Sequence, residues 1–169
     1  MFEKDDYVIC GNNGICSVHD ITTLTISGVD KNRKYYLLKP IYQPGSTVYI
    51  PVDAAEQSLR KALSCEEAHA LIASIPHIPP IPLTDEKILE RTYKEYMHDG
   101  SCESLVKLIK TIYLRKEKRI LKGAKVTSVD SKYFKLAEDF LYGELSISLG
   151  LSKDEVKTYI TDCIDKNQL

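Results

Sequence analysis

The spacing of apolar and polar residues changes near residue 76, and this change divides the chain into two parts. In the first part, short runs rich in β-branched and aromatic residues are separated by turn residues such as those of GNNG and QPGS. The runs occupy residues 7–10, 15–26, 34–42 and 47–52. Short strands at this spacing predict a small, strongly bent antiparallel sheet or open barrel.

Elsewhere, apolar residues recur every three or four positions, which predicts helices. One helix is expected to close the first part at residues 64–75, where Ser64 and Glu67 have the spacing of a capping box. Four more helices follow, and we expect Thr84, Ser101 and Ser152 to begin the first, second and fourth of them. Their expected ranges are 84–100, 101–122, 131–149 and from 152 onward.

Four prolines separate these two kinds of pattern, at positions 76, 79, 80 and 82. Proline at this density excludes helix and favours a stiff, extended connector. The sequence therefore predicts an α+β protein of two domains. Residues 1–75 form the small bent sheet or open barrel, residues 76–83 form a linker that acts as a hinge, and residues 84–169 form an all-helical bundle.

Composition narrows the class of protein. The chain is 43% hydrophobic and 28% charged, which is ordinary for a globular protein. No apolar run approaches the roughly 20 residues that a membrane-spanning helix needs. The first residues carry acids where a secretion signal carries bases, so we expect a cytoplasmic protein without a membrane partner.

The sequence offers little for catalysis or metal binding. Its five cysteines and four histidines are scattered, without the spacing of a zinc site or a disulfide framework. It contains no phosphate-binding loop, nucleophile elbow or metalloprotease motif. We therefore expect a binding protein with no catalytic residues, no metal and no cofactor. An enzyme that uses a cleft between the two parts is a weaker alternative.

One helix-length stretch, residues 107–125, is strongly basic, although the whole chain has 23 Lys and Arg against 24 Asp and Glu. Three interpretations compete: a solvated helix face, a membrane-surface helix and a track for nucleic-acid phosphates. The apolar stripe of this helix is needed for packing in its own bundle, which disfavours the membrane interpretation. The charge pattern alone does not choose between the other two.

The order of motifs resembles the CarD family of bacterial transcription factors that bind RNA polymerase. The opening FEKDDYVICGNNGICSVHDI, with its turn glycine Gly14, is similar to the start of that family. TVYIPVDAAE (47–56) resembles the family's V-x-[VI]-P signature, and FLYGELS (140–146) resembles the end of a family helix. The resemblance covers residues 2–149, roughly.

The resemblance implies that the first part is a tudor-like RNA-polymerase-interacting domain, as also found in transcription-repair coupling factors. It would dock on the N-terminal lobe of the polymerase β subunit through an exposed sheet edge. The residues implied in this contact are Val48, Tyr49, Ile50 and Pro51, with Leu24 on the neighbouring strand. Leu24 and Tyr49 stand where other members have arginines, which implies a more apolar contact. An exposed edge also permits edge-paired dimers.

The resemblance further implies that the helical part contacts promoter DNA at the upstream edge of the transcription bubble, through the backbone and largely without reading sequence. The candidate residues are Arg115, Lys116, Arg119, Lys122 and Lys125, with Lys87 and Arg91 as secondary candidates. Family members often carry a wedging tryptophan; this chain has none, and Asp85 or Glu86 stands near that position. The alternative function is a protein–protein interaction module that does not contact DNA.

Overall fold

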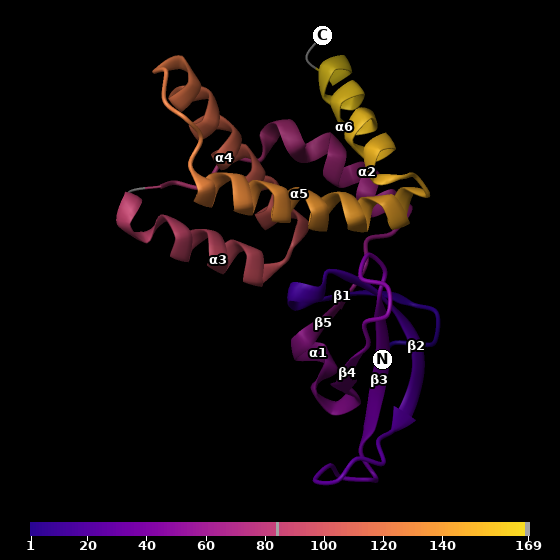
Figure 1. The fold of residues 1–169 in the computed structure, drawn as a ribbon. Coiled ribbons are helices and arrows are strands. Elements are labelled where there is room, and N and C mark those ends of the chain that lie inside the picture. Colours follow the sequence, from indigo (N-terminus) through magenta and orange to yellow (C-terminus); the bar gives the residue numbers. More distant parts are fainter. Residues whose placement is uncertain (84, 168–169) are drawn as a thin grey trace. The chain divides into compact units, whose positions relative to one another are not determined.

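The computed structural model describes residues 1–83 and 85–167, which form two compact units, Met1–Ala62 and Leu63–Leu169 (Figure 1). The first unit is an antiparallel sheet and the second is helical, so the predicted α+β class is confirmed. The expected cap at Thr84 lies outside the described residues.

The N-terminal unit is a five-stranded antiparallel sheet with the strand order β4-β3-β2-β1-β5. Because β4 and β5 are different edges, the sheet is open rather than closed into a barrel. The strands are β1 (Tyr7–Cys10), β2 (Ile15–Thr23), β3 (Lys34–Pro40), β4 (Val48–Pro51) and β5 (Leu59–Lys61). Two short helical segments, η2 (Val52–Ala54) and α1 (Ala55–Ser58), connect β4 to β5.

The turn between β1 and β2 forms at GNNG, as the glycines of this stretch predict. A 3-10 turn, η1 (Gly11–Asn13), joins the strands, and Gly11 and Gly14 have φ of 40° and 65°. A side chain disfavours these backbone conformations. The pairing of β2 with β3 shifts register between Val18 and Asp20, an irregularity of the kind that increases the local twist and bend of a sheet. One face of the sheet holds a core that includes Val8, Cys16, Val18, Tyr36 and Leu38.

The second unit contains five α-helices and two short 3-10 segments in its described part. The segments are α2 (Cys65–Ser74), η3 (Ile75–His77), η4 (Glu86–Ile88), α3 (Leu89–Asp99), α4 (Cys102–Leu121), α5 (Ser128–Leu149) and α6 (Lys153–Asn167). The capping boxes expected at Ser64 and Ser152 are both formed. Each serine hydroxyl accepts from the backbone N–H of the glutamate three residues on, whose carboxylate accepts in return.

The boundary between the units lies earlier than the sequence predicted. It falls after Ala62, not after residue 75, and α2 belongs to the helical unit. The apolar stripe of α2 predicted a buried face but not the neighbour that covers it. Ala68 and Ile72 of α2 are buried in the same core as α4 and α5.

The proline-rich segment is not a connector between the units, contrary to the prediction. Ile81 is buried, and its backbone N–H donates to Thr111 Oγ1 of α4 at 2.8 Å. Lys110 of α4 donates to the backbone carbonyls of Ile75 and Ile78. After the 3-10 turn η3, the prolines keep the rest of this segment out of a helix, while Ile78 and Ile81 anchor it along α4.

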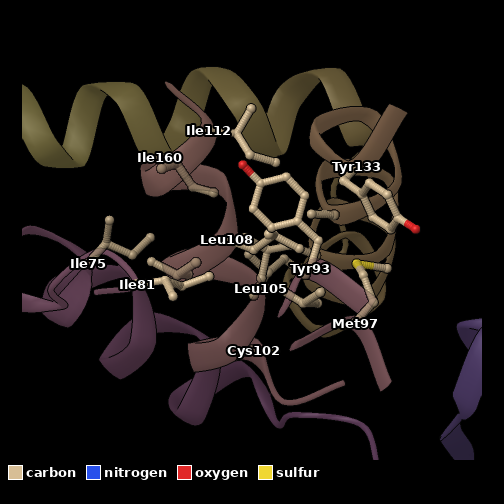
Figure 2. Close-up of a cluster of buried hydrophobic side chains, with 14 of the residues drawn as sticks. Ile75, Ile81, Tyr93, Met97, Cys102, Leu105, Leu108, Ile112, Tyr133 and Ile160 are labelled. Atoms are coloured by element: carbon tan, nitrogen blue, oxygen red, sulfur yellow. The ribbon is translucent and has the colours of Figure 1, made fainter. Parts of the chain in front are cut away.

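Figure 2 shows how the core of the helical unit is assembled from segments far apart in the sequence. Tyr93 and Met97 from α3 meet Leu105 and Leu108 from α4, and Tyr133 enters from α5. The aromatic rings of Tyr93 and Tyr133 have centroids 5.5 Å apart. The core therefore fixes α3, α4 and α5 relative to one another.

Candidate functional site

The first candidate site is β4, one edge of the N-terminal sheet. β4 pairs with β3 on one side, with Tyr49 opposite Leu37 and Ile50 opposite Tyr36. Side chains alternate along the strand. Val48 and Ile50 pack against the sheet core, whereas Tyr49 points to the other face and is 42% exposed. Of the predicted contact residues, Tyr49 is therefore the one best placed to meet a partner.

Leu24 does not lie beside this edge as predicted. It follows the last residue of β2, and β3 lies between β2 and β4. Leu24 is half-buried, and Pro51 ends β4 opposite Tyr35. Because proline has no backbone N–H, the donors that β4 can offer to another strand end before residue 51.

The second candidate site is the basic stretch of α4, and the structure divides its cations into two groups. Arg115 belongs to the inward group. Its Nη1 lies 2.6 Å from Glu86 Oε1, and its Nε lies 3.3 Å from both carboxylate oxygens of Asp130. Asp130 is fully buried and also accepts from the Tyr93 hydroxyl at 2.8 Å. Arg115 thus bridges η4, α4 and α5 from within the helical unit.

The pKa shifts in this network follow from its contacts. The hydrogen bonds from Arg115 hold the pKa of Glu86 below its ordinary value, and they raise the pKa of Arg115. Burial, together with the bond to Asp130, raises the pKa of Tyr93. All three shifts preserve the charge states of the network across neutral pH.

Two further predicted DNA contacts are partly engaged inside the unit. The Lys116 ammonium lies 3.8 Å from the centre of the Phe134 ring, a cation–π contact. Arg119 Nε donates to the backbone carbonyl of Lys125 at 2.8 Å and so holds the turn that follows α4. Both side chains are half-buried.

The outward group lies at the C-terminal end of α4, here named the α4 tip: Lys118, Ile120, Leu121, Lys122 and Lys125. All five are exposed, with Ile120 and Leu121 at 63% and 87%. The backbone N–H of Ala124 donates to the Arg119 carbonyl at 2.8 Å, so the turn folds back on the helix and keeps the three lysines together. Cations also stabilise the negative end of a helix dipole, so helix stability is a second explanation for the lysines of the α4 tip, besides a contact with DNA.

The secondary candidates on the preceding segments are both exposed. Lys87 lies in η4, and its backbone N–H donates to the Asp85 side chain. Arg91 in α3 forms an ion pair with Glu95 at 3.2 Å, one helical turn away. An exposed pair of this kind is weak and leaves the guanidinium accessible to another anion.

The sequence carries a signal that separates Arg115 from the other cations of the basic stretch. Leu105, Leu108, Ile112 and Arg115 are spaced by three, four and three residues, so Arg115 continues the buried stripe of α4. A cation in that register faces the neighbouring helices. Its partners, Glu86 and Asp130, are 29 and 15 residues away, and sequence reasoning did not identify them.

Among the side chains that the structure describes, those of residues 1–83 and 85–163, no three His, Cys, Asp or Glu are placed to hold a metal ion together. Among those same residues, no helix has the length and apolar character to span a bilayer.

The N-terminal unit is thus a small open antiparallel sheet whose edge strand β4 carries the exposed Tyr49. Residues 2–63 match the family model of the CarD-like/TRCF RID domain. The N-terminal unit is therefore a CarD-like RNA-polymerase-interacting domain, which confirms the predicted resemblance for this part of the chain. This family is a polymerase-binding family, not an enzyme family. The match ends at residue 63, where the second unit begins. No curated protein matched the chain.

Proposed function

We propose that this protein is a transcription regulator that binds the β subunit of RNA polymerase through its N-terminal unit and promoter DNA through its helical unit. The observation that carries the proposal is the CarD-like RNA-polymerase-interacting domain at residues 2–63. Joined to it is a helical unit with an exposed cluster of lysines at the α4 tip.

The proposed contact with the N-terminal lobe of β uses the edge strand β4. A partner strand can add to this edge through main-chain hydrogen bonds, and the exposed Tyr49 ring then supplies an apolar anchor. Tyrosine is well suited to an interface because one end of its ring is apolar and the other can form a hydrogen bond. A contact of this kind depends less on salt than one made by arginines.

The proposed contact with DNA uses the cations that remain exposed. Lys118, Lys122 and Lys125 form the main contact at the α4 tip, with Lys87 and Arg91 as secondary contacts. Lys116 and Arg119 keep part of their charge accessible at its margin. Lysine contacts to phosphates add affinity without reading sequence, which suits a factor that acts at many promoters by changing open-complex stability. Arg115 holds the helices in place.

The test is to reverse the charge of Lys118 and Lys122 to glutamate in the full chain. A matched control reverses Lys153 and Lys157, which lie on α6. We expect the first variant to bind polymerase normally but to lose its protection of upstream promoter DNA and its effect on open-complex lifetime. Loss of two phosphate contacts should reduce the slope of log affinity against log salt by about 2. Unchanged protection and open-complex lifetime in this variant would contradict the DNA contact.

The internal ion pairs of Arg115 favour a second candidate function. If the basic stretch serves to hold the helices together, the protein is an interaction module that binds polymerase and recruits or blocks another protein. This candidate predicts no DNA protection by the wild-type chain at any salt concentration, together with normal binding to polymerase.

A further inference from the structure

The helical unit contains a cavity of about 590 Å³ that the proposed function does not use. Its walls are α4, α5 and α6, together with Ile75 of η3. Figure 1 shows α4 leading into one end of α5 and α6 following its other end. The aliphatic and phenylalanine side chains of the lining are Ile75, Val106, Ile109, Phe134, Leu141 and Ile160. A volume of this size lies within the range of sites that bind small organic molecules.

The cavity also contains a cation that lacks an acidic partner. Lys110 lines it, and its ammonium donates to the backbone carbonyls of Ile75 and Ile78. No described carboxylate lies within ion-pair distance of this ammonium. Burial also lowers the pKa of Lys110. An anion in the cavity would give this ammonium the opposite charge that the two neutral carbonyls do not carry.

The other charged groups of the cavity leave it positive. Lys157 on α6 is exposed at its rim. Glu138 on α5 is the one acid in the lining, and Tyr142, whose pKa is raised by burial and by the charge of Glu138, lines the cavity beside it. The cavity therefore combines an apolar floor with two lysines and a single glutamate.

We propose that this cavity binds a small amphipathic carboxylate, with its apolar chain against Ile109, Phe134 and Ile160 and its carboxylate at Lys110. The length of the cavity favours a small molecule over a docked helix. Its lining on α4 runs from Val106 to Tyr113, which corresponds to roughly 10 Å at 1.5 Å per residue. This is about two turns, fewer than the three or four of an average helix.

The test uses decanoate as the probe and the full-length chain, with binding measured by calorimetry and by methyl NMR of the isoleucines. Decyltrimethylammonium, which has a similar chain and the opposite charge, is the control ligand. We expect decanoate to bind at least about tenfold more tightly than decyltrimethylammonium. We also expect it to shift the methyl signals of Ile109 and Ile160. Equal binding of the two ligands, or shifts confined to isoleucines that do not line the cavity, would overturn the proposal.

Two variants locate the site. Ile109→Trp fills the cavity, and Leu114→Trp places the same ring on an exposed part of α4 outside it. We expect the first to weaken decanoate binding by about tenfold or more and the second to leave it unchanged. Lys110→Met should weaken decanoate and not decyltrimethylammonium. Lys110 also binds backbone carbonyls, so its replacement can disturb the fold. Lys157→Met removes a charge at an exposed position instead, and we expect it to weaken decanoate binding by a smaller factor.

An acidic amphipathic helical peptide is the competing occupant. If such a peptide binds the full chain while decanoate does not, and Ile109→Trp abolishes peptide binding, the site is a protein-docking groove and the small-ligand proposal is wrong. These measurements do not involve polymerase or DNA, so their outcome is independent of the proposed function.

Discussion

Replacing Arg115 with methionine distinguishes a structural role for this residue from a role in DNA binding. Methionine has nearly the same helix propensity as arginine, so the substitution tests side-chain contacts rather than the helix itself. In the structure the guanidinium is the cationic partner of Asp130, which is fully buried. If Arg115 holds α4, α5 and η4 together, its loss must destabilise the helical unit.

The expected magnitude follows from the partners that remain. Removing one member of a buried ion pair typically costs about 3–5 kcal/mol, because the other charge is left buried. Asp130 keeps its hydrogen bond from Tyr93, and the exposed Glu86 adds little. We therefore expect Arg115→Met to lower the free energy of unfolding by about 2–4 kcal/mol. In an Asp130→Asn background, where no buried charge is left, the same change should cost about 1 kcal/mol.

The assay is urea unfolding of the full chain followed by far-ultraviolet circular dichroism, which mainly reports the helical unit. Lys118→Met, on the exposed side of the same helix, is the matched control and should change the unfolding free energy by less than about 0.5 kcal/mol. The structural role is refuted if Arg115→Met and the control unfold at the same urea concentration. Loss of DNA protection by Arg115→Met at unchanged stability would instead make Arg115 a phosphate contact.

Three further predictions concern other parts of the chain. Glu144 is buried and accepts hydrogen bonds from the Leu63 N–H at 3.0 Å and from the Cys102 thiol at 3.1 Å. Glu144→Ala should therefore lower the free energy of urea unfolding of the helical unit by about 2–3 kcal/mol. Glu144→Gln keeps an acceptor and should cost less. Ser64→Ala removes the capping box of α2 and should cost about 1 kcal/mol in the helical transition, whereas no effect there would contradict the assignment of α2 to that unit. Burial raises the pKa of Cys16 to about 12, so the folded state keeps a proton that the unfolded thiol loses above about pH 8.5. Stability of the N-terminal unit should therefore fall as pH rises from there toward 12, by up to about 1.4 kcal/mol per pH unit, and Cys16→Ala should remove that part of the slope.

Features encoded by neighbouring residues were predictable from the sequence. The turn at GNNG needs positive φ, which glycine adopts without strain, and the capping boxes at Ser64 and Ser152 depend on residues three positions apart. The change from strand-like to helix-like spacing gave the correct fold class for the same reason. Each of these signals is local, and tertiary packing did not override it.

Features that depend on distant residues were not predictable in the same way. The apolar face of α2 must be buried, but its sequence does not identify the helices that bury it. This helix was therefore placed in the wrong unit. Proline density fixes the backbone of residues 76–83 but does not reveal that Ile81 is buried against α4. Likewise, Arg115 and Lys122 belong to one charge run, and only the positions of Glu86 and Asp130 distinguish them.

The measurement that tests the central claim most directly is binding of the full chain to the purified N-terminal lobe of the RNA polymerase β subunit. Tyr49→Glu places a charge on the exposed face of β4, and Tyr7→Glu is its matched control, because Tyr7 on β1 is 41% exposed against 42% for Tyr49. We predict that the wild-type chain and Tyr7→Glu bind and that Tyr49→Glu loses at least about 2 kcal/mol of binding free energy. Failure of the wild-type chain to bind this lobe would contradict the account, and equal binding by all three proteins would exclude β4 as the contact.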